Sequence, residues 1–338
     1  MKNLLYIGNK LSGKGLNATT IETLGAALQN EGFVIKYASS KKIPILRLFD
    51  MCFSVFRYRN VVSLVLIDTY STSAFWYAFL VSQICRIVRI PYIPILHGGN
   101  LPARLRKNPF LTALVFKNSY KNVAPSKYLL SIFESNGYSN VVHIPNSIAI
   151  ENYSFTPRII ESPKILWVRA FARIYNPKMA IDVFQKVKRV YPNAELCMVG
   201  PDKDGSLNAT KVYAKSLNVE VTFTGGLQKE EWISLSECCN VFVNTTHFDN
   251  MPVSVMEAMA LGLPVVSTNV GGIPFLLEHK TDGLLVDDND AEAMFEAVLE
   301  LVQEEGLTKK ITSNARKKIE DMDWKVVRNQ WVDVFSDA

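Results

Sequence analysis

The sequence of 338 residues predicts an α/β protein with two doubly wound parallel-sheet domains of similar size. Short β-branched apolar runs alternate with longer runs of helical periodicity, which is the pattern of parallel strands joined by helical crossovers. Apolar residues make up 48% of the chain and charged residues 20%, a composition that excludes a disordered protein. A polar segment at 150–162, which contains Pro157, divides the alternation into two series.

The first series begins with an apolar run that ends in Gly8, as expected for a strand that enters a glycine loop. The region from Val61 to Val88 is apolar, but Asp68 and a polar run at 69–73 interrupt it, so we expect a strand and a core helix there and no membrane span. The expected strands are Leu4–Gly8, Phe33–Ala38, Val61–Asp68, Tyr92–His97, Asn122–Pro125 and Val141–Ile144. The expected helices are Ile21–Glu31, 73–89, Pro109–Tyr120 and Lys127–Asn136.

The second series repeats this alternation after the linker. We assign one domain to residues 1–155 and the other to 163–338, with a C-terminal helix able to cross back onto the first domain. Ligands of doubly wound sheets bind at the carboxyl ends of the strands, so we expect the site in a cleft between the two sheets. The expected strands are Lys164–Val168, Glu195–Val199, Glu220–Thr224, Val241–Asn244, Pro264–Ser267 and Gly283–Val286. The expected helices are 177–190, 206–217, 229–238 and 252–262, with a final helical stretch at 290–336.

The two halves of the chain differ in charge. Residues 1–150 contain 17 Lys and Arg against 5 Asp and Glu, a net +12, whereas residues 151–338 have a net charge of −7. Basic residues of the first half are interleaved with Ile, Leu and Phe, which favours contact with an anionic lipid surface over an ordinary solvated face. No nucleic-acid motif accompanies them, so we expect no nucleic-acid partner. These residues are Lys36, Lys41, Lys42, Arg47, Arg57, Arg59, Arg104, Arg106 and Lys107.

Cysteine and histidine spacing gives no sign of a metal site. The five cysteines lack CxxC spacing and the four histidines lack HExxH spacing, so we expect reduced core thiols and no structural metal. The N-terminal apolar run is too short for a signal peptide. These observations predict a cytoplasmic protein, at most peripheral at the inner face of the cell membrane.

The loop after the first strand matches G-x4-G-K but ends in Gly15, where a phosphate-binding P-loop needs Ser or Thr to hold magnesium. The apolar run that ends in Asp68 imitates the metal-binding strand of such ATPases. A P-loop-like nucleotide hydrolase is therefore one alternative. The other interpretation is that Gly13 and Gly15 let the backbone approach a diphosphate ahead of a helix N-terminus.

The segment 244–267 carries the strongest functional pattern. Asp249 lies in a loop after a strand, Pro252 is suited to start a helix, and Glu257 lies inside that helix. The two acids can therefore face the same cleft, beside a helix N-terminus whose N–H groups suit phosphates. A carboxylate such as that of Glu257 can accept two hydrogen bonds from a ribose diol. An amphipathic helix with a solvated Glu257 is the simpler alternative.

This segment resembles the E-x7-E signature of family 4 glycosyltransferases, which have the GT-B fold of two Rossmann-like domains. The run from Glu257 to Val266 reproduces the second part of the signature, whereas Asp249 replaces the first Glu and Asn250 the usual glycine. Further marks of the family occur in the expected order. They are Pro145-Asn146, Val199-Gly200, Phe223-Thr224-Gly225, Gly271-Gly272-Ile273-Pro274 and Asp282-Gly283-Leu284-Leu285-Val286.

The resemblance implies a role for each matching residue. Glu257 would hold the donor ribose and Asp249 would lie near the sugar hydroxyls, while His97 matches the histidine that reaches the transferred sugar from the first domain. The backbone around the first acid would surround the donor, with N–H groups from all but the proline. These backbone positions are Asn250, Met251 and Pro252.

The diphosphate clamp departs from the family pattern of Gly-Arg-Leu-x-x-x-Lys. The glycine is absent, Arg169 is displaced by one place, and Tyr175 stands where the lysine is usual. A leaving diphosphate needs cationic or N–H compensation. Arg169 is the first candidate, and Arg173 or Lys178 could replace the lysine.

The family resemblance thus implies a retaining, metal-independent hexosyltransferase without a cofactor. Its substrates would be a UDP- or GDP-sugar donor and a glycan or lipid-linked sugar acceptor, most simply in bacterial surface polysaccharide synthesis. In this arrangement the first domain would bind the acceptor and the second the donor. A catalytically silent GT-B protein that binds nucleotide-sugars is compatible with Asp249 and the altered clamp.

Overall fold

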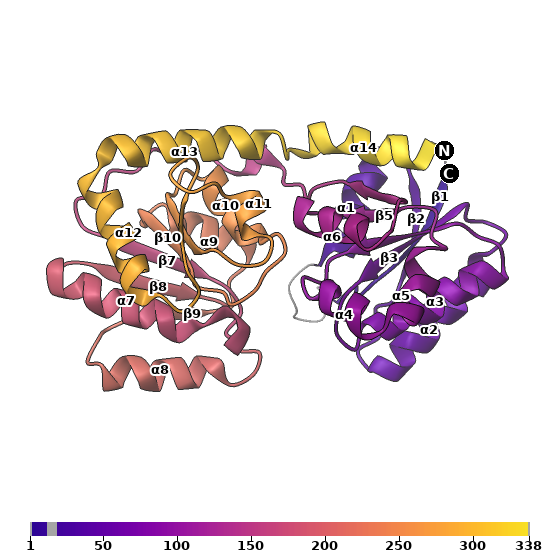
Figure 1. Cartoon of the computed structure of the whole chain (residues 1–338), viewed down its shortest axis with the longest axis horizontal. Coiled ribbons are helices and arrows are strands. Elements are labelled where there is room, and N and C mark those ends of the chain that lie inside the picture. Colours follow the sequence, from indigo (N-terminus) through magenta and orange to yellow (C-terminus); the bar gives the residue numbers. More distant parts are fainter. Residues whose placement is uncertain (1, 12–18, 337–338) are drawn as a thin grey trace. The chain divides into compact units, whose positions relative to one another are not determined.

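The computed structural model describes residues 2–11 and 19–336. The chain divides into two compact units. Unit 1 comprises Met1–Asn146 together with Trp324–Ala338, and unit 2 comprises Ser147–Asp323. Each unit contains a six-stranded parallel sheet with helices on its faces (Figure 1). The predicted fold class is therefore confirmed.

Unit 1 has the strand order β2-β1-β3-β4-β5-β6, and all its strand pairs are parallel. Its strands are β1 Asn3–Ile7, β2 Val34–Ala38, β3 Leu64–Thr69, β4 Tyr92–Leu96, β5 Asn122–Ala124 and β6 Val141–His143. Its helices are α1 Thr20–Asn30, α2 Pro44–Tyr58, α3 Phe75–Ile87, α4 Leu101–Lys107, α5 Pro109–Phe116, α6 Lys127–Ser135 and α14 Trp324–Ser336.

Both faces of this sheet are buried because helices cover each of them. Successive side chains of a strand point to opposite faces, so each strand contributes to both layers. In β1, Leu4 and Tyr6 pack with α1 and α14, whereas Leu5 and Ile7 pack with α2 and α3. Trp331 of α14 is 3% exposed within the first of these clusters. The last helix of the chain is thus part of the core of unit 1.

Unit 2 has the strand order β12-β11-β10-β7-β8-β9, again with parallel pairs throughout. Its strands are β7 Lys164–Val168, β8 Glu195–Val199, β9 Thr222–Gly225, β10 Val241–Asn244, β11 Val265–Thr268 and β12 Leu284–Val286. Its helices are α7 Pro177–Val190, α8 Ser206–Ser216, α9 Lys229–Ser236, α10 Val253–Ala260, α11 Ile273–Leu276, α12 Ala291–Gln303 and α13 Glu305–Glu320, with 3-10 turns η2 Ile150–Asn152 and η3 Arg173–Tyr175.

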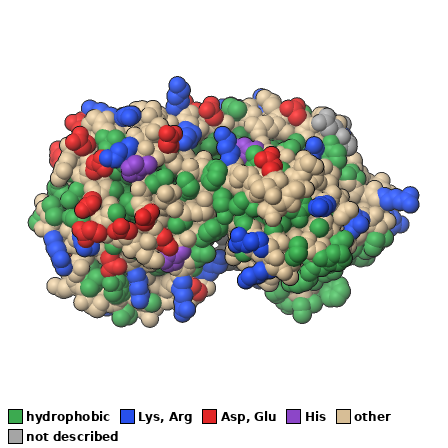
Figure 2. Space-filling view, in the orientation of Figure 1, with side chains coloured by type: hydrophobic (Ala, Val, Ile, Leu, Met, Phe, Trp, Pro, Cys, Tyr) green, Lys and Arg blue, Asp and Glu red, His purple; other side chains and the backbone are tan. Residues whose placement is uncertain are grey.

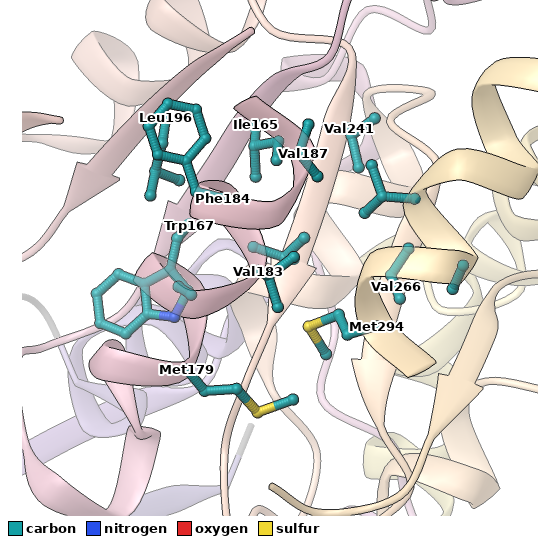
Figure 3. Packing of buried hydrophobic residues seen from close by; sticks show 14 of the residues in the cluster. Ile165, Trp167, Met179, Val183, Phe184, Val187, Leu196, Val241, Val266 and Met294 are labelled. Carbon is teal, nitrogen blue, oxygen red and sulfur yellow. The ribbon is translucent and has the colours of Figure 1, made fainter. Parts of the chain in front are cut away.

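The core of unit 2 also has two layers. On one face Trp167 of β7 lies among Phe184 of α7 and Met294 of α12 (Figure 3). Its indole Nε1 donates to Thr245 Oγ1 at 3.0 Å, so the buried polar atom is satisfied. The other face is covered by α10 and α13, and it includes Leu166. Strands β7 and β10 thus lie between two packed layers of helices.

The division between the units differs from the predicted linker. It follows Asn146 instead of lying within 150–162. Ile148 forms a parallel bridge with Asp323, and the Tyr153 hydroxyl donates to Glu257, so the start of the expected linker is part of unit 2.

Helix α2 is the main element that the sequence analysis did not predict. The sequence shows Lys41, Lys42, Arg47, Arg57 and Arg59 interleaved with apolar residues there, without a single helical stripe. The structure places a 15-residue helix there.

No helix in the described part of the chain is both long and apolar enough to cross a membrane.

All five cysteines are free thiols, as predicted. Cys238 is not a core residue, however. It is exposed because it lies in the turn that follows α9, whereas the adjacent Cys239 is buried. The expectation of five core thiols is therefore wrong at Cys238.

Candidate functional site

Arg169 and Asp249 form an ion pair at the carboxyl edge of the unit 2 sheet. Arg169 follows β7 directly, and its Nη2 lies 2.6 Å from Asp249 Oδ2. Its Nε donates to Asn244 Oδ1 at the end of β10, at 3.3 Å. The side chains are 13% and 17% exposed, respectively. The Nη1 amino group has no hydrogen-bond partner among the described residues, so the guanidinium is both held in place and able to donate further.

The backbone that carries this ion pair needs two close glycine approaches. A Cβ on Gly200, whose φ is +152°, would lie 1.8 Å from the carbonyl oxygen of Arg169. A Cβ on Gly272 would lie 1.8 Å from the carbonyl oxygen of Asn250, and the Gly272 N–H donates to Asp249 O at 2.9 Å. These contacts explain physically why glycine stands at two of the family marks.

The loop from Asp249 to Pro252 leads into α10. Asn250, Met251 and Pro252 are all buried. The N–H of Asn250 donates to Asp249 Oδ1 at 2.7 Å, so this N–H, which the sequence analysis offered to the donor, is occupied by the neighbouring carboxylate. Pro252 is the N-cap residue of α10, which starts at Val253, and it makes no side-chain hydrogen bond to the helix. The first turn of α10 therefore presents positive potential beside Arg169 and Asp249.

Tyr175 stands at the position of the missing lysine and lies against the Arg169 guanidinium. The Arg169 Cζ is 5.0 Å from the centre of the Tyr175 ring. Burial raises the pKa of Tyr175 above its usual value, so the phenol is neutral at pH 7. The tyrosine therefore supplies an aromatic contact to the cation and no charge of its own.

Glu257 is 5% exposed within α10 and is engaged by two side chains that the sequence analysis missed. The hydroxyl of Tyr153 donates to Oε1 at 2.7 Å, and Lys229 Nζ lies 2.9 Å from the same oxygen. Burial, followed by the charge of Glu257, raises the pKa of Tyr153 well above its usual value, which keeps this phenol a donor. No motif could have indicated Tyr153, because it is 104 residues away from Glu257 in sequence. Lys229 also lies outside the motif, in a different helix.

The two candidate replacements for the lysine are exposed and have contacts of their own. Arg173 is exposed in η3, and its backbone N–H donates to Asp204 Oδ2 at 3.0 Å. Lys178 is exposed in the first turn of α7, with its Nζ 5.2 Å from the centre of the Tyr213 ring of α8. These contacts involve neither Arg169 nor Asp249.

In unit 1, His97 follows β4 and pairs with a buried carboxylate at the end of β3. His97 Nε2 lies 2.9 Å from Asp68 Oδ1, and the side-chain exposures are 9% and 0%. The same oxygen accepts from the Tyr6 hydroxyl at 3.0 Å. The second oxygen, Oδ2, is buried without a hydrogen-bond partner in the described chain. Because Nε2 is engaged by Asp68, the Nδ1 atom of His97 is the ring nitrogen left for a ligand.

This arrangement gives Asp68 a different role from the one in the P-loop interpretation. A metal-binding carboxylate has to face a bound phosphate, whereas Asp68 is fully buried against Tyr6 and His97. A Cβ on Gly8 would lie 2.5 Å from Asp68 Oδ2, so Gly8 packs closely onto this carboxylate. Gly13 and Gly15 lie outside the described residues.

Residues 150–318 match the family model described as glycosyl transferases group 1, which covers half of the chain. The chain belongs to this family. The match contains Arg169, Asp249 and Glu257, so the candidate site of unit 2 lies inside the family region of this group 1 glycosyl transferase.

Individual relatives of this group 1 chain are distant. An uncharacterized glycosyltransferase from Methanocaldococcus jannaschii is 26% identical over 246 residues, which is 70% of this chain and 65% of that protein. The amylovoran biosynthesis glycosyltransferase AmsK of Erwinia amylovora is 44% identical over 72 residues, which is 21% of this chain and 18% of AmsK. The chain thus spans less than two thirds of the length of either curated relative.

A solved structure shares the whole fold of this group 1 chain. Anabaena HepE, in a crystal structure with UDP-glucose, has a TM-score of 0.83 and covers 100% of both chains at 16% sequence identity. At this identity the likeness supports the GT-B fold alone. It agrees with the two parallel sheets described above.

Proposed function

We propose that this protein transfers a sugar from a nucleotide diphosphate-sugar, with UDP or GDP as the carrier, to a glycan or glycolipid acceptor. The observation that carries the proposal is the Arg169–Asp249 pair beside the start of α10. A departing nucleoside diphosphate develops negative charge. A part-buried guanidinium with a further donor at Nη1, next to a helix N-terminus, suits that charge.

Within this proposal the acidic residues hold the two ends of the donor. Glu257 accepts from the ribose hydroxyls, and its carboxylate is oriented for this by Tyr153 and Lys229. Asp249 accepts from hydroxyls of the sugar while Arg169 compensates the charge of the diphosphate. Arg169, not Arg173 or Lys178, is thus the primary cation of the clamp.

His97 is proposed to contact the transferred sugar through Nδ1. Asp68 then acts as a positioning residue, because its bond to Nε2 fixes the orientation of the imidazole ring. The proposed reaction retains the configuration of the sugar, as the family resemblance implies. It uses no metal ion, since Arg169 and the start of α10 supply the compensating charge.

Two observations support the finer parts of the proposal, which are the product class and the contact with a membrane. The segment shared with AmsK, whose name refers to amylovoran biosynthesis, supports a bacterial surface polysaccharide as the product. The net charge of +12 on residues 1–150 supports contact with anionic lipid at the inner face of the cell membrane.

Thermal unfolding against UDP, GDP, ADP and ATP, each with magnesium and with EDTA, tests donor binding. A nucleotide at 100 times its Kd adds about 2.7 kcal/mol to the free energy of unfolding. We expect a rise in Tm with UDP or GDP that survives EDTA. A rise only with ATP and magnesium would contradict the proposal and favour the nucleotide hydrolase.

Turnover separates a transferase from a silent binding protein. With the nucleotide identified, release of UDP or GDP from the matching nucleotide-sugars is measured for the wild type and for the Glu257→Gln variant. We expect release by the wild type and a raised KM for the donor in the variant. Binding without any release, across the sugars tested, would instead identify a nucleotide-sugar-binding protein.

A further inference from the structure

Helix α2 carries apolar side chains on two opposite faces. One face packs into unit 1, where Met51 and Val55 are fully buried against the sheet and α3. The opposite face is open to solvent, with Phe49 68% and Phe53 63% exposed. A surface helix normally buries its single apolar stripe and shows polar residues outward, so the second stripe of α2 has no role in the fold.

Further exposed apolar residues lie beside α2 and on the neighbouring α3. Those in and beside α2 follow helical spacing, which places them on one side of the helix. Hydrophobic side chains gather on the surface over α2 in the space-filling view (Figure 2). The exposed apolar residues in and beside α2 are Ile43, Ile45, Leu46, Phe49, Phe53, Phe56 and Val61, and those on the neighbouring α3 are Trp76, Leu80 and Ile87.

The segment that carries the exposed stripe, residues 41–61, contains five cationic residues and one acidic residue. The single carboxylate between 41 and 61 is Asp50, which is hydrogen-bonded to the Ser39 hydroxyl. Within 2–11 and 19–336, none of the five cations of this segment is ion-paired with a carboxylate. They are Lys41, Lys42, Arg47, Arg57 and Arg59.

We infer that α2 docks unit 1 onto an anionic lipid bilayer, lying in the plane of the interface with its exposed apolar stripe among the acyl chains. A helix of 15 residues is about 22 Å long at 1.5 Å per residue, too short to span a hydrocarbon core of roughly 30 Å. An interfacial helix combines an apolar face with flanking Lys and Arg, and α2 has both.

Charge also argues against a second copy of the chain as the occupant. A two-fold symmetric dimer through α2 would bring two segments of net charge +4 together, because each carries five cations and one acid between 41 and 61. Anionic head groups neutralise these cations instead. The assignment specifies the lipid contact proposed above, yet it does not depend on sugar transfer, because vesicle binding needs neither donor nor acceptor.

The basic residues named from the sequence do not all contribute to this surface. Arg104 is engaged inside unit 1, where its Nε donates to Ser71 O at 2.9 Å and its guanidinium lies 4.4 Å from the centre of the Phe75 ring. Arg57 and Arg59 are exposed at the end of α2. They are therefore the cations to remove in a test.

The test is sedimentation of the purified full chain with phosphatidylcholine vesicles that contain either no or 30% phosphatidylglycerol. We expect pelleting with the anionic vesicles and little with the neutral ones. The double substitution Phe49→Ser with Phe53→Ser should lower the partition coefficient at least tenfold, since both exposed rings would be buried in lipid. The double substitution Arg57→Gln with Arg59→Gln should lower it roughly 25-fold, at about fivefold for each cation.

A control variant replaces two exposed apolar residues of unit 2, Val190→Ser with Val212→Ser, and should pellet as the wild type does. Thermal unfolding of each variant verifies that it is folded. If the double Phe→Ser variant does not fold, the double Arg→Gln variant provides the test. Equal pelleting with neutral and anionic vesicles, no pelleting at all, or wild-type pelleting of both α2 variants would overturn the assignment. A dimer of the wild type in light scattering that the Phe variant abolishes would show that a second copy covers α2.

Discussion

Replacement of Arg169 by alanine removes the one guanidinium that the structure places with Asp249. The substitution eliminates the 2.6 Å ion pair, the 3.3 Å hydrogen bond to Asn244 and the donor at Nη1. Asp249 keeps the N–H of Asn250 at 2.7 Å and is 17% exposed, so the fold should lose only about 1–2 kcal/mol. The larger effect is expected on catalysis.

The magnitude follows from the burial of Arg169. Two unit charges 4 Å apart interact by about 4 kcal/mol at an effective dielectric constant near 20, which suits a side chain that is 13% exposed. Loss of one donor to a developing oxyanion typically costs about 2.7–4 kcal/mol. We therefore expect kcat to fall about 100- to 1,000-fold in Arg169→Ala. Arg169→Lys should fall less, because it keeps the charge and loses the fork that also reaches Asn244.

The assay is release of the nucleoside diphosphate at saturating donor, with Tm measured for every variant. Arg173→Ala and Lys178→Ala are the matched controls, since both remove an exposed cation that the structure does not place beside Asp249. Both should stay within about threefold of the wild-type kcat. An unchanged kcat in Arg169→Ala, together with a large loss in Lys178→Ala, would refute the assignment of the clamp.

Three further predictions follow from the site and its support. Asp68→Asn should lower kcat about tenfold or more, because the amide keeps the shape and an acceptor for His97 Nε2 but loses the charge that makes such a hydrogen bond worth about 1.5–3 kcal/mol. Gly200→Ala should lower Tm by at least several degrees, because its Cβ would meet a backbone carbonyl oxygen at 1.8 Å in a left-handed conformation. Iodoacetamide at pH 8 should label Cys238 first and leave Cys239 unreacted in the folded protein, because burial raises the pKa of Cys239 to about 12.

Each of these has its own contrary result. Wild-type kcat in Asp68→Asn would mean that the carboxylate serves packing alone, and Asp68→Ala would then show it through Tm. A Gly200→Ala variant as stable as the wild type would contradict the close approach to β7. Mass spectrometry that finds Cys239 alkylated as fast as Cys238 under native conditions would contradict its burial.

The fold class could be predicted because its information is local. Alternating strand and helix patterns with glycine and proline at their ends specify a parallel sheet, whatever the detailed packing. The motif from Asp249 to Gly262 is also local, and its helix lies where the pattern placed it. Helix α2 was not predicted because it has apolar residues on two faces, with Met51 buried and Phe53 exposed. Its sequence therefore lacks the single apolar stripe by which an amphipathic helix is identified.

By itself, the sequence determined the two doubly wound sheets, the acids of the motif and the basic character of the first half. Only the tertiary structure decided which groups meet. Arg169 reaches Asp249 across 80 residues, because the carboxyl ends of parallel strands and the loops after them converge on one edge of the sheet. Tyr153 reaches Glu257 across 104 residues, because the segment before β7 packs against α10 on one face of that sheet. Such pairings depend on strand order, and strand order arises from packing between elements that no short stretch of sequence contains.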